Sequence, residues 1–204
     1  MSTARPPVPP AKASGLRRHR ALMARLASGP APEAVLLGDS LAAGWPEPAL
    51  SRATGLPACN LGLPGDRVQT TRWRLAAMAA IAVRPRLAVV MVGTNSFADG
   101  DAPEAIVAGL AALVALLRTA WAPPVIVLAT VPWRAPPPGR CEADRLALNA
   151  AIGAWAGNEA LPLLDGEAAL HPEPATRLEA DRLHLNARGY AALSAALASL
   201  LRTG

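Results

Sequence analysis

Residues 35–41 read Val35-Leu36-Leu37-Gly38-Asp39-Ser40-Leu41, a short apolar run that is followed by the two polar residues Asp39 and Ser40. An apolar run of this length, bounded by a turn, is typical of a strand that is buried on both faces. Such strands belong to parallel sheets, where ligands bind beyond the carboxyl ends of the strands. Ser40 is therefore a candidate nucleophile at the end of a buried strand.

Working outward, the same pattern recurs along the chain. Four more segments are short, apolar and bounded by turns, at residues 58–61, 87–93, 125–131 and 161–164. The segments between and after them are long enough for helices, at residues 67–83, 103–120, 141–156 and 187–201, the last with Asn186 placed as its N-cap. Five strands alternating with helices predict an α/β fold, a three-layer α/β/α sandwich around a five-stranded parallel sheet.

The length of 204 residues suits one domain with a core of its own. We expect residues 1–14 to form a flexible Pro-rich leader and residues 15–204 to form the single domain. Residues 16–27 place Leu16, Met23 and Leu26 on one helical face, and this pattern favours a helix docked on the domain over a helix lying on a membrane surface.

The formal net charge of +5 is unevenly distributed. Residues 1–32 contain six basic residues and no acid, which leaves the rest of the chain at −1. Nucleic-acid binding needs clustered basic residues with interleaved aromatics across the domain, and the chain lacks that pattern. A nucleic-acid partner is not expected.

Cys59 and Cys141 offer no disulfide framework, and no His, Cys, Asp or Glu pair has metal-ligand spacing. We therefore expect neither a metal nor another cofactor. No stretch of about 18 apolar residues is free of Arg, Pro or a turn, so no membrane span is expected. The N-terminus lacks an apolar signal region, and a cytoplasmic location follows as the default. A homodimer is left open.

A serine nucleophile needs a base, and the base needs an orienting acid. Asp181-Arg182-Leu183-His184, just before the last helix, supplies an acid and an imidazole three residues apart. The order Ser, Asp, His is that of many hydrolases, although no Gly-x-Ser-x-Gly elbow surrounds Ser40. His171 stays open as a second base, with Asp165 nearby.

Asp39 offers a rival chemistry, because an aspartate at a strand end also begins phosphoacceptor proteins. Aspartyl-phosphate phosphatases need a second aspartate two residues on, where this chain has Leu41. Receiver domains need a late lysine, and the only lysine is Lys12. Asp39 is therefore expected to hold the turn around Ser40.

Four short blocks, taken together and in order, resemble the SGNH/GDSL hydrolase family. They are Gly38-Asp39-Ser40-Leu41, Asn60-Leu61-Gly62, Gly93-Thr94-Asn95 and Asp181-Arg182-Leu183-His184. The stretches at residues 60–67, 73–75 and 89–95 are similar to the branch that resembles platelet-activating-factor acetylhydrolase. The resemblance implies the flavodoxin-like SGNH fold.

The resemblance also implies a role for each matching residue. Ser40 would attack the ester carbonyl, His184 would take and return the proton, and Asp181 would orient the imidazole. The backbone N–H groups of Ser40 and Gly62 and the side-chain amide of Asn95 would bind the oxyanion.

Substrate contacts are expected from two segments. The Pro-stiffened stretch at residues 132–140, with Trp133, is predicted to border the acyl or alcohol pocket, with an ordinary surface loop as the alternative. Residues 96–98, with Phe97, are the other expected wall. We predict a serine esterase for small acyl esters, acetyl or short chain. A thioesterase, a lysophospholipase and a non-catalytic binding module are the alternatives.

Overall fold

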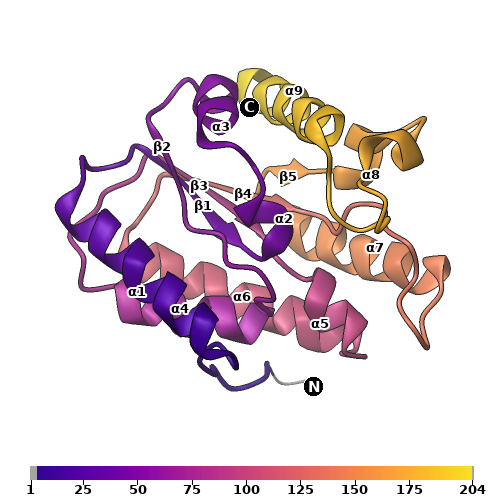
Figure 1. The fold of residues 1–204 in the computed structure, drawn as a ribbon, viewed down its shortest axis with the longest axis horizontal. Helices are drawn as coiled ribbons and strands as arrows, with labels where there is room; N and C mark the ends of the chain where they lie inside the picture. Colours follow the sequence, from indigo (N-terminus) through magenta and orange to yellow (C-terminus); the bar gives the residue numbers. More distant parts are fainter. Residues whose placement is uncertain (1–3, 204) are drawn as a thin grey trace.

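The structure is a computed structural model that describes residues 4–203. Its strands form one parallel sheet in the order β2-β1-β3-β4-β5, as predicted in number and direction (Figure 1). The strands are β1 (Ala34–Gly38), β2 (Ala58–Asn60), β3 (Leu87–Met91), β4 (Val125–Ala129) and β5 (Leu163–Leu164). This order is the flavodoxin-like one, in which the chain reverses direction across the sheet after β2.

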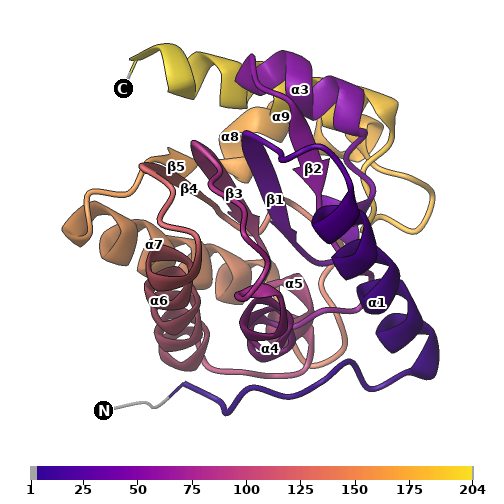
Figure 2. The same ribbon diagram turned by 90° about the vertical axis from the view of Figure 1, so that its left-hand side faces the viewer.

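Helices cover both faces of the sheet and make three layers (Figure 2). One layer contains α1 (Ala13–Ser28), α4 (Val68–Met78), α6 (Pro103–Ala120) and α7 (Glu142–Asn158), with the short α5 (Thr94–Ala98) beside them. The opposite layer contains α3 (Glu47–Thr54), α8 (Gly166–Leu170) and α9 (Ala187–Thr203). The one-turn α2 (Ser40–Ala43) and the 3₁₀ turn Pro174–Arg177 complete the described elements. The α/β/α sandwich predicted from the alternation is confirmed.

Alternating side chains of each strand supply two separate cores. Val35 and Leu37 of β1 are buried against the layer of α4 and α6, while Leu36 between them is buried on the side of α3 and α9. All five residues of β1 are buried, as are all five of β3. A strand with apolar residues on both faces can only lie inside a sheet that is covered twice.

The strand order reverses between β1 and β3, so their carboxyl ends form the topological switch point of the sheet. β1 pairs with β2 on one side and with β3 on the other, and β1 to β3 runs in register from Ala34–Leu87 to Gly38–Met91. Ser40 follows β1 and Asn95 follows β3. Both therefore lie at the topological switch point, where ligands bind in sheets of this kind.

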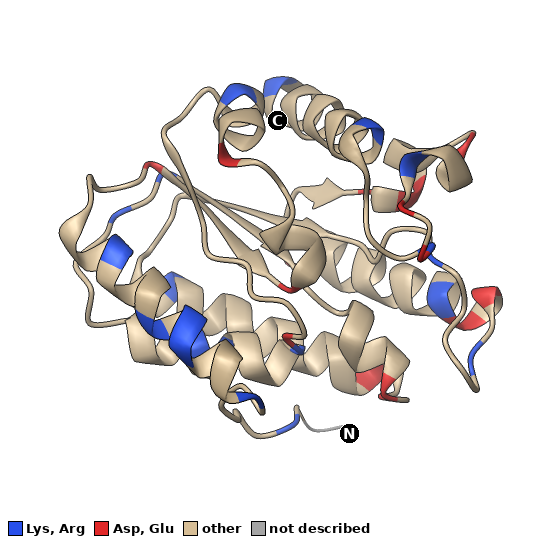
Figure 3. Cartoon of the chain, viewed as in Figure 1, with Lys and Arg blue, Asp and Glu red and all other residues tan. Residues whose placement is uncertain are grey.

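The predicted helix near the N-terminus exists and docks on the domain. It is longer than expected, Ala13–Ser28, and its buried residues are His19 and Leu26. Leu22 and Met23 of the helix pack against the core cluster, whereas its arginines, coloured blue in Figure 3, are exposed. Residues before the helix also contact the domain, since Arg5 forms an ion pair with Asp101.

The helix α6 is the one described segment that is long and apolar enough to cross a membrane by length and composition. In the fold it serves as a core helix. Ile106, Leu110, Leu113 and Leu117 are buried among the residues of the core cluster. Its apolar composition is thus accounted for by packing between the sheet and its neighbouring helices.

Candidate active site

Ser40 is the first residue of α2, directly beyond β1. Asp39 is the N-cap of this turn, and its Oδ1 accepts a hydrogen bond of 2.9 Å from the backbone N–H of Leu41. Burial raises the pKa of Asp39 to about 7, against the opposing effect of backbone N–H groups at Leu41 and Gly93. Asp39 therefore holds the turn around the serine, as predicted, and leaves Ser40 as the hydroxyl at the surface.

Ser40, His184 and Asp181 form a continuous chain of hydrogen bonds. Ser40 Oγ lies 3.0 Å from His184 Nε2, and His184 Nδ1 lies 2.6 Å from Asp181 Oδ2. A carboxylate only accepts, so Nδ1 carries the proton and Nε2 is free to accept the proton of the serine. The structure thus brings Ser40 together with Asp181 and His184, which lie 141 and 144 positions later in the sequence. The acid and the imidazole are three positions apart in one turn.

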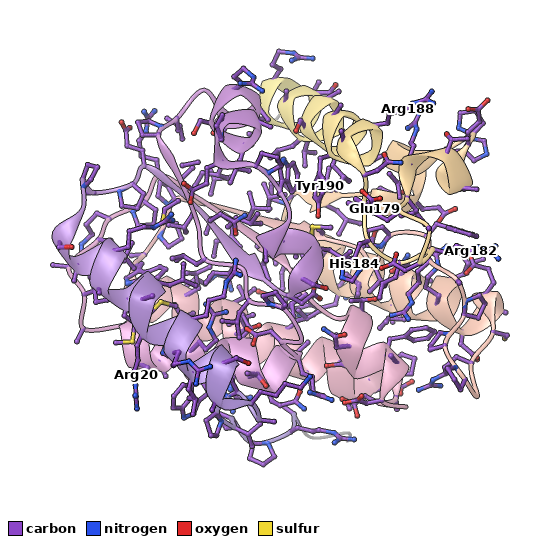
Figure 4. The ribbon with its side chains drawn as sticks, in the orientation of Figure 1. Arg20, Glu179, Arg182, His184, Arg188 and Tyr190 are labelled. Atoms are coloured by element: carbon purple, nitrogen blue, oxygen red, sulfur yellow. The ribbon has the colours of Figure 1, made fainter. Side chains whose placement is uncertain are left out.

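The loop that carries the acid and the imidazole is exposed. The side chains of His184 and Asp181 are 40% and 50% accessible, and Figure 4 shows His184 beside α2. The hydrogen bond from His184, followed by the backbone N–H groups of His184 and Leu183, lowers the pKa of Asp181 to about 2. Asp181 is therefore ionised at any pH where the imidazole is used as a base.

The Gly62 loop, residues 61–66, lies on the other side of Ser40. It continues the pairing with β1, because Leu61 N–H donates to Leu36 O at 2.8 Å and Leu63 N–H donates to Gly38 O at 2.9 Å. A Cβ on Gly62 would lie 2.3 Å from the backbone nitrogen of Ala43. The glycine is required by this close backbone approach to α2.

The N–H of Gly62 has a partner in the structure. It donates to Oδ1 of Asn60 at 2.8 Å, and Nδ2 of the same Asn60 donates to Ala42 O at 2.7 Å and to Trp45 O at 2.8 Å. Asn60 therefore ties the Gly62 loop to the backbone that follows Ser40. An oxyanion would share the Gly62 N–H with Asn60.

Asn95 is held against the same loop. Its Nδ2 donates to Asp66 O at 2.8 Å, which leaves the second N–H of the amide for another acceptor. The three expected oxyanion donors are thus connected through the Gly62 loop, which touches α2 at one end and Asn95 at the other.

The two expected substrate contacts lie in different surroundings. Phe97 is 2% exposed and belongs to the core cluster, so its position does not support a direct substrate contact. Trp133 is partly buried beneath the guanidinium of Arg182, 5.5 Å from the ring centre. Ala135 N–H donates to Arg182 O at 2.8 Å, so the segment at residues 132–140 does lie beside the Asp181–His184 loop.

Two residues that contribute to the site were given no role from the sequence. Tyr190 of α9 lies between α9 and α2 in Figure 4, and its hydroxyl donates to Leu41 O at 2.9 Å. Asn60 is the second. His171, the alternative base, is at the C-terminal end of α8, and the imidazole that meets Ser40 is that of His184.

A cavity of about 430 Å³ opens beside Asn95. One wall is the Gly62 loop with the following Arg67, and the other is the N-terminal segment around residues 10–15. The described residues contain no group of three or more His, Cys, Asp or Glu side chains placed to hold a metal ion.

Comparison with known proteins identifies the family. The profile of the GDSL-like lipase/acylhydrolase family matches residues 36–192. Platelet-activating factor acetylhydrolase IB subunit alpha1 of Bos taurus is 32% identical over 176 residues, which cover 83% of this chain and 75% of that protein. The chain belongs to the GDSL-like lipase/acylhydrolase family.

Solved structures agree with the GDSL fold. A GDSL-like lipase from Bacteroides thetaiotaomicron superposes with a TM-score of 0.72 at 20% identity, covering 92% of this chain and 98% of that one. An acetylxylan esterase from Geobacillus stearothermophilus gives a TM-score of 0.62 at 18% identity, covering 86% and 96%. The GDSL-family chain described here is a hydrolase that acts on ester bonds, as the resemblance implied.

Proposed function

We propose that the protein is a serine esterase that hydrolyses small acyl esters through an acyl-enzyme intermediate. The observation that carries the proposal is the hydrogen-bonded chain from Ser40 Oγ through His184 to Asp181. Membership of an acylhydrolase family supports the same reaction class.

In the first half of the reaction, Ser40 Oγ attacks the ester carbonyl carbon while its proton passes to His184 Nε2. The imidazolium that forms is stabilised by the Asp181 carboxylate, whose low pKa keeps it charged. Collapse of the tetrahedral intermediate breaks the bond to the alcohol, which leaves with the proton from Nε2. Water then attacks the acyl-enzyme by the same route and releases the acid.

The negative charge on the carbonyl oxygen requires donors placed in advance. We assign this role to the backbone N–H groups of Ser40 and Gly62 and to the side-chain amide of Asn95. The connection of all three through the Gly62 loop supports the assignment. The Gly62 N–H would form a bifurcated bond between the oxyanion and Asn60 Oδ1.

A short acyl group, acetyl in the first instance, is the proposed substrate class. The names of the relatives support it, since one is an acetylhydrolase and another an acetylxylan esterase. A thioesterase or lysophospholipase would use the same catalytic residues, so the leaving group must be determined by assay.

The test is a chain-length series of p-nitrophenyl esters, from acetate to palmitate, measured on the wild type and on Ser40→Ala. We expect hydrolysis that is fastest for short chains and is lost in Ser40→Ala, together with covalent labelling of Ser40 by a fluorophosphonate. Wild-type rates in Ser40→Ala would exclude Ser40 as nucleophile. A folded protein that neither turns over esters nor takes the label would be a binding module.

A further inference from the structure

Arg74 of α4 places a completely buried guanidinium beneath the Gly62 loop. Its side chain is 0% exposed, and its counter-ion Asp66 is 1% exposed. A buried charge of this kind is costly unless every donor is paired with good geometry. The partners of Arg74 therefore show what the buried charge holds in place.

Two donors of Arg74 reach the two ends of the Gly62 loop. Nη2 donates to Leu61 O at 2.6 Å, and Nη1 donates to Asp66 Oδ2 at 2.6 Å. Nε points to Nδ1 of His19 on α1 at 3.4 Å. One planar group thus fixes the beginning of the loop, its end and the helix that lies behind it.

The bond to Leu61 O acts on the Gly62 N–H. The carbonyl of Leu61 and the N–H of Gly62 belong to the same planar peptide unit, so orienting one orients the other. A charged donor on the carbonyl also polarises the peptide and strengthens its N–H as a donor, since chains of hydrogen bonds reinforce one another at low dielectric.

The bond to Asp66 acts on Asn95. Asp66 accepts from Arg74 through its side chain and from Asn95 through its backbone carbonyl, at 2.8 Å. Thr71 Oγ1 adds a bond of 3.2 Å to the same carboxylate oxygen. Loss of the ion pair would release the residue on which the Asn95 amide rests.

We propose that Arg74 is a positioning residue for ester hydrolysis, which orients and polarises the Leu61–Gly62 peptide and, through Asp66, holds the Asn95 amide. The inference rests on the proposed function, because it assumes that Gly62 and Asn95 bind the oxyanion. Arg74 touches no substrate and acts only through these two donors.

The experiment compares Arg74→Met, Arg74→Lys and Asp66→Asn on p-nitrophenyl acetate. Arg145→Met is the matched control, because Arg145 is also buried, at 1% exposure, and is paired with Glu142 and Glu167 on α7 and α8. Each variant is assayed below its own unfolding temperature, with folding checked by circular dichroism.

We expect kcat to fall by about 10- to 100-fold in Arg74→Met with KM within about 2-fold, a smaller loss than removal of a direct oxyanion donor. Arg74→Lys should recover part of kcat, because an ammonium keeps the charge but cannot serve both ends of the loop. Arg145→Met should lower the unfolding temperature without changing kcat. Arg74→Lys and Asp66→Asn carry the test if Arg74→Met does not fold.

Folded Arg74 and Asp66 variants with wild-type kcat would overturn the inference and leave the ion pair a contributor to stability alone. An equal loss of kcat in Arg145→Met would overturn it as well. Ser40→Ala, assayed in parallel, separates this failure from failure of the proposed function. Activity that survives in Ser40→Ala would exclude the serine mechanism.

Discussion

The two sides of Ser40 differ in how they are held. His184 and Asp181 lie on an exposed loop, with side chains 40% and 50% accessible, whereas the Gly62 loop rests on the buried Arg74–Asp66 pair. Proton transfer needs an imidazole within hydrogen-bond reach of the serine, while oxyanion binding needs donors that do not move. The contrast predicts that substitutions on the exposed side change rate alone, and those on the buried side change rate and stability together.

The largest effect is expected from His184→Ala. We predict a loss of kcat of about 10⁴- to 10⁶-fold, because no base remains for Ser40, with an unfolding temperature within about 2 °C of the wild type. Ester hydrolysis and thermal unfolding measure the two quantities. Asp181→Asn should lower kcat less. A large drop in unfolding temperature in His184→Ala would show that the exposed loop also contributes to stability, against the predicted contrast.

Asn95→Ala tests the buried side through a direct donor. Loss of the amide should lower kcat by about 10²- to 10³-fold with little change in KM, because the donor acts on charge that develops in the transition state. Steady-state kinetics with p-nitrophenyl acetate provides the measurement. If KM rose while kcat stayed constant, Asn95 would bind the ground state and not the oxyanion.

Asp39→Asn tests the buried side through the pH dependence of stability. Burial raises the pKa of Asp39 from 3.8 to about 7, so the folded state binds a proton more tightly than the unfolded state. The contribution of Asp39 to stability is thus fully present below about pH 4 and is lost as the pH rises through about 7.

Asparagine stays neutral and keeps an oxygen to accept from Leu41. The stability of Asp39→Asn relative to the wild type should therefore increase between pH 4 and 7, by up to about 4 kcal/mol. Urea unfolding at several pH values measures it. A difference that is constant with pH would show that Asp39 is already ionised in the folded protein at low pH.

Gly62→Ala tests the buried side through the stability of the folded protein. The new Cβ would lie 2.3 Å from Ala43 N, so the backbone must shift at a cost of about 1–3 kcal/mol in unfolding free energy. Gly157→Ala on α7 is the control, since no atom lies within 4 Å of its added Cβ, and it should stabilise the helix by about 0.5–1 kcal/mol. Chemical denaturation of both variants gives the comparison.

The sequence predicted those parts of the fold that depend on apolar periodicity. Helix α6 was predicted with its observed bounds, Pro103–Ala120, and the cap of α9 was correct, since Asn186 Oδ1 accepts from Arg188 N–H at 3.0 Å. The strand at residues 87–93 is shorter, Leu87–Met91, because the backbone turns at Gly93 with φ of 147°. The one-turn α2 and α5 were missed, because four or five residues have no period to detect.

The candidate site was predictable only where its residues belong to short blocks. Ser40, Asp181 and His184 meet as expected, but the roles of Asn60 and Arg74 depend on backbone carbonyls that no local pattern specifies. One signal was present: α4 lacks a clear apolar face and buries Gln69, Thr70 and Arg74. Polar side chains that are buried need hydrogen-bond partners, so a helix that carries them into an apolar domain indicates a buried polar network.

The N-terminal segment has a practical consequence for anyone who redesigns the chain. Pro10 and Lys12 form part of the wall of the cavity beside Asn95, and a Cβ on Gly15 would lie 2.9 Å from Pro10. A protein trimmed to begin at residue 13 would therefore lack this part of the cavity wall, and the cavity would be more open. A bulky tag fused to the new N-terminus would lie next to the cavity. The shape of the cavity beside Asn95 therefore depends on keeping residues 10–15 in the chain.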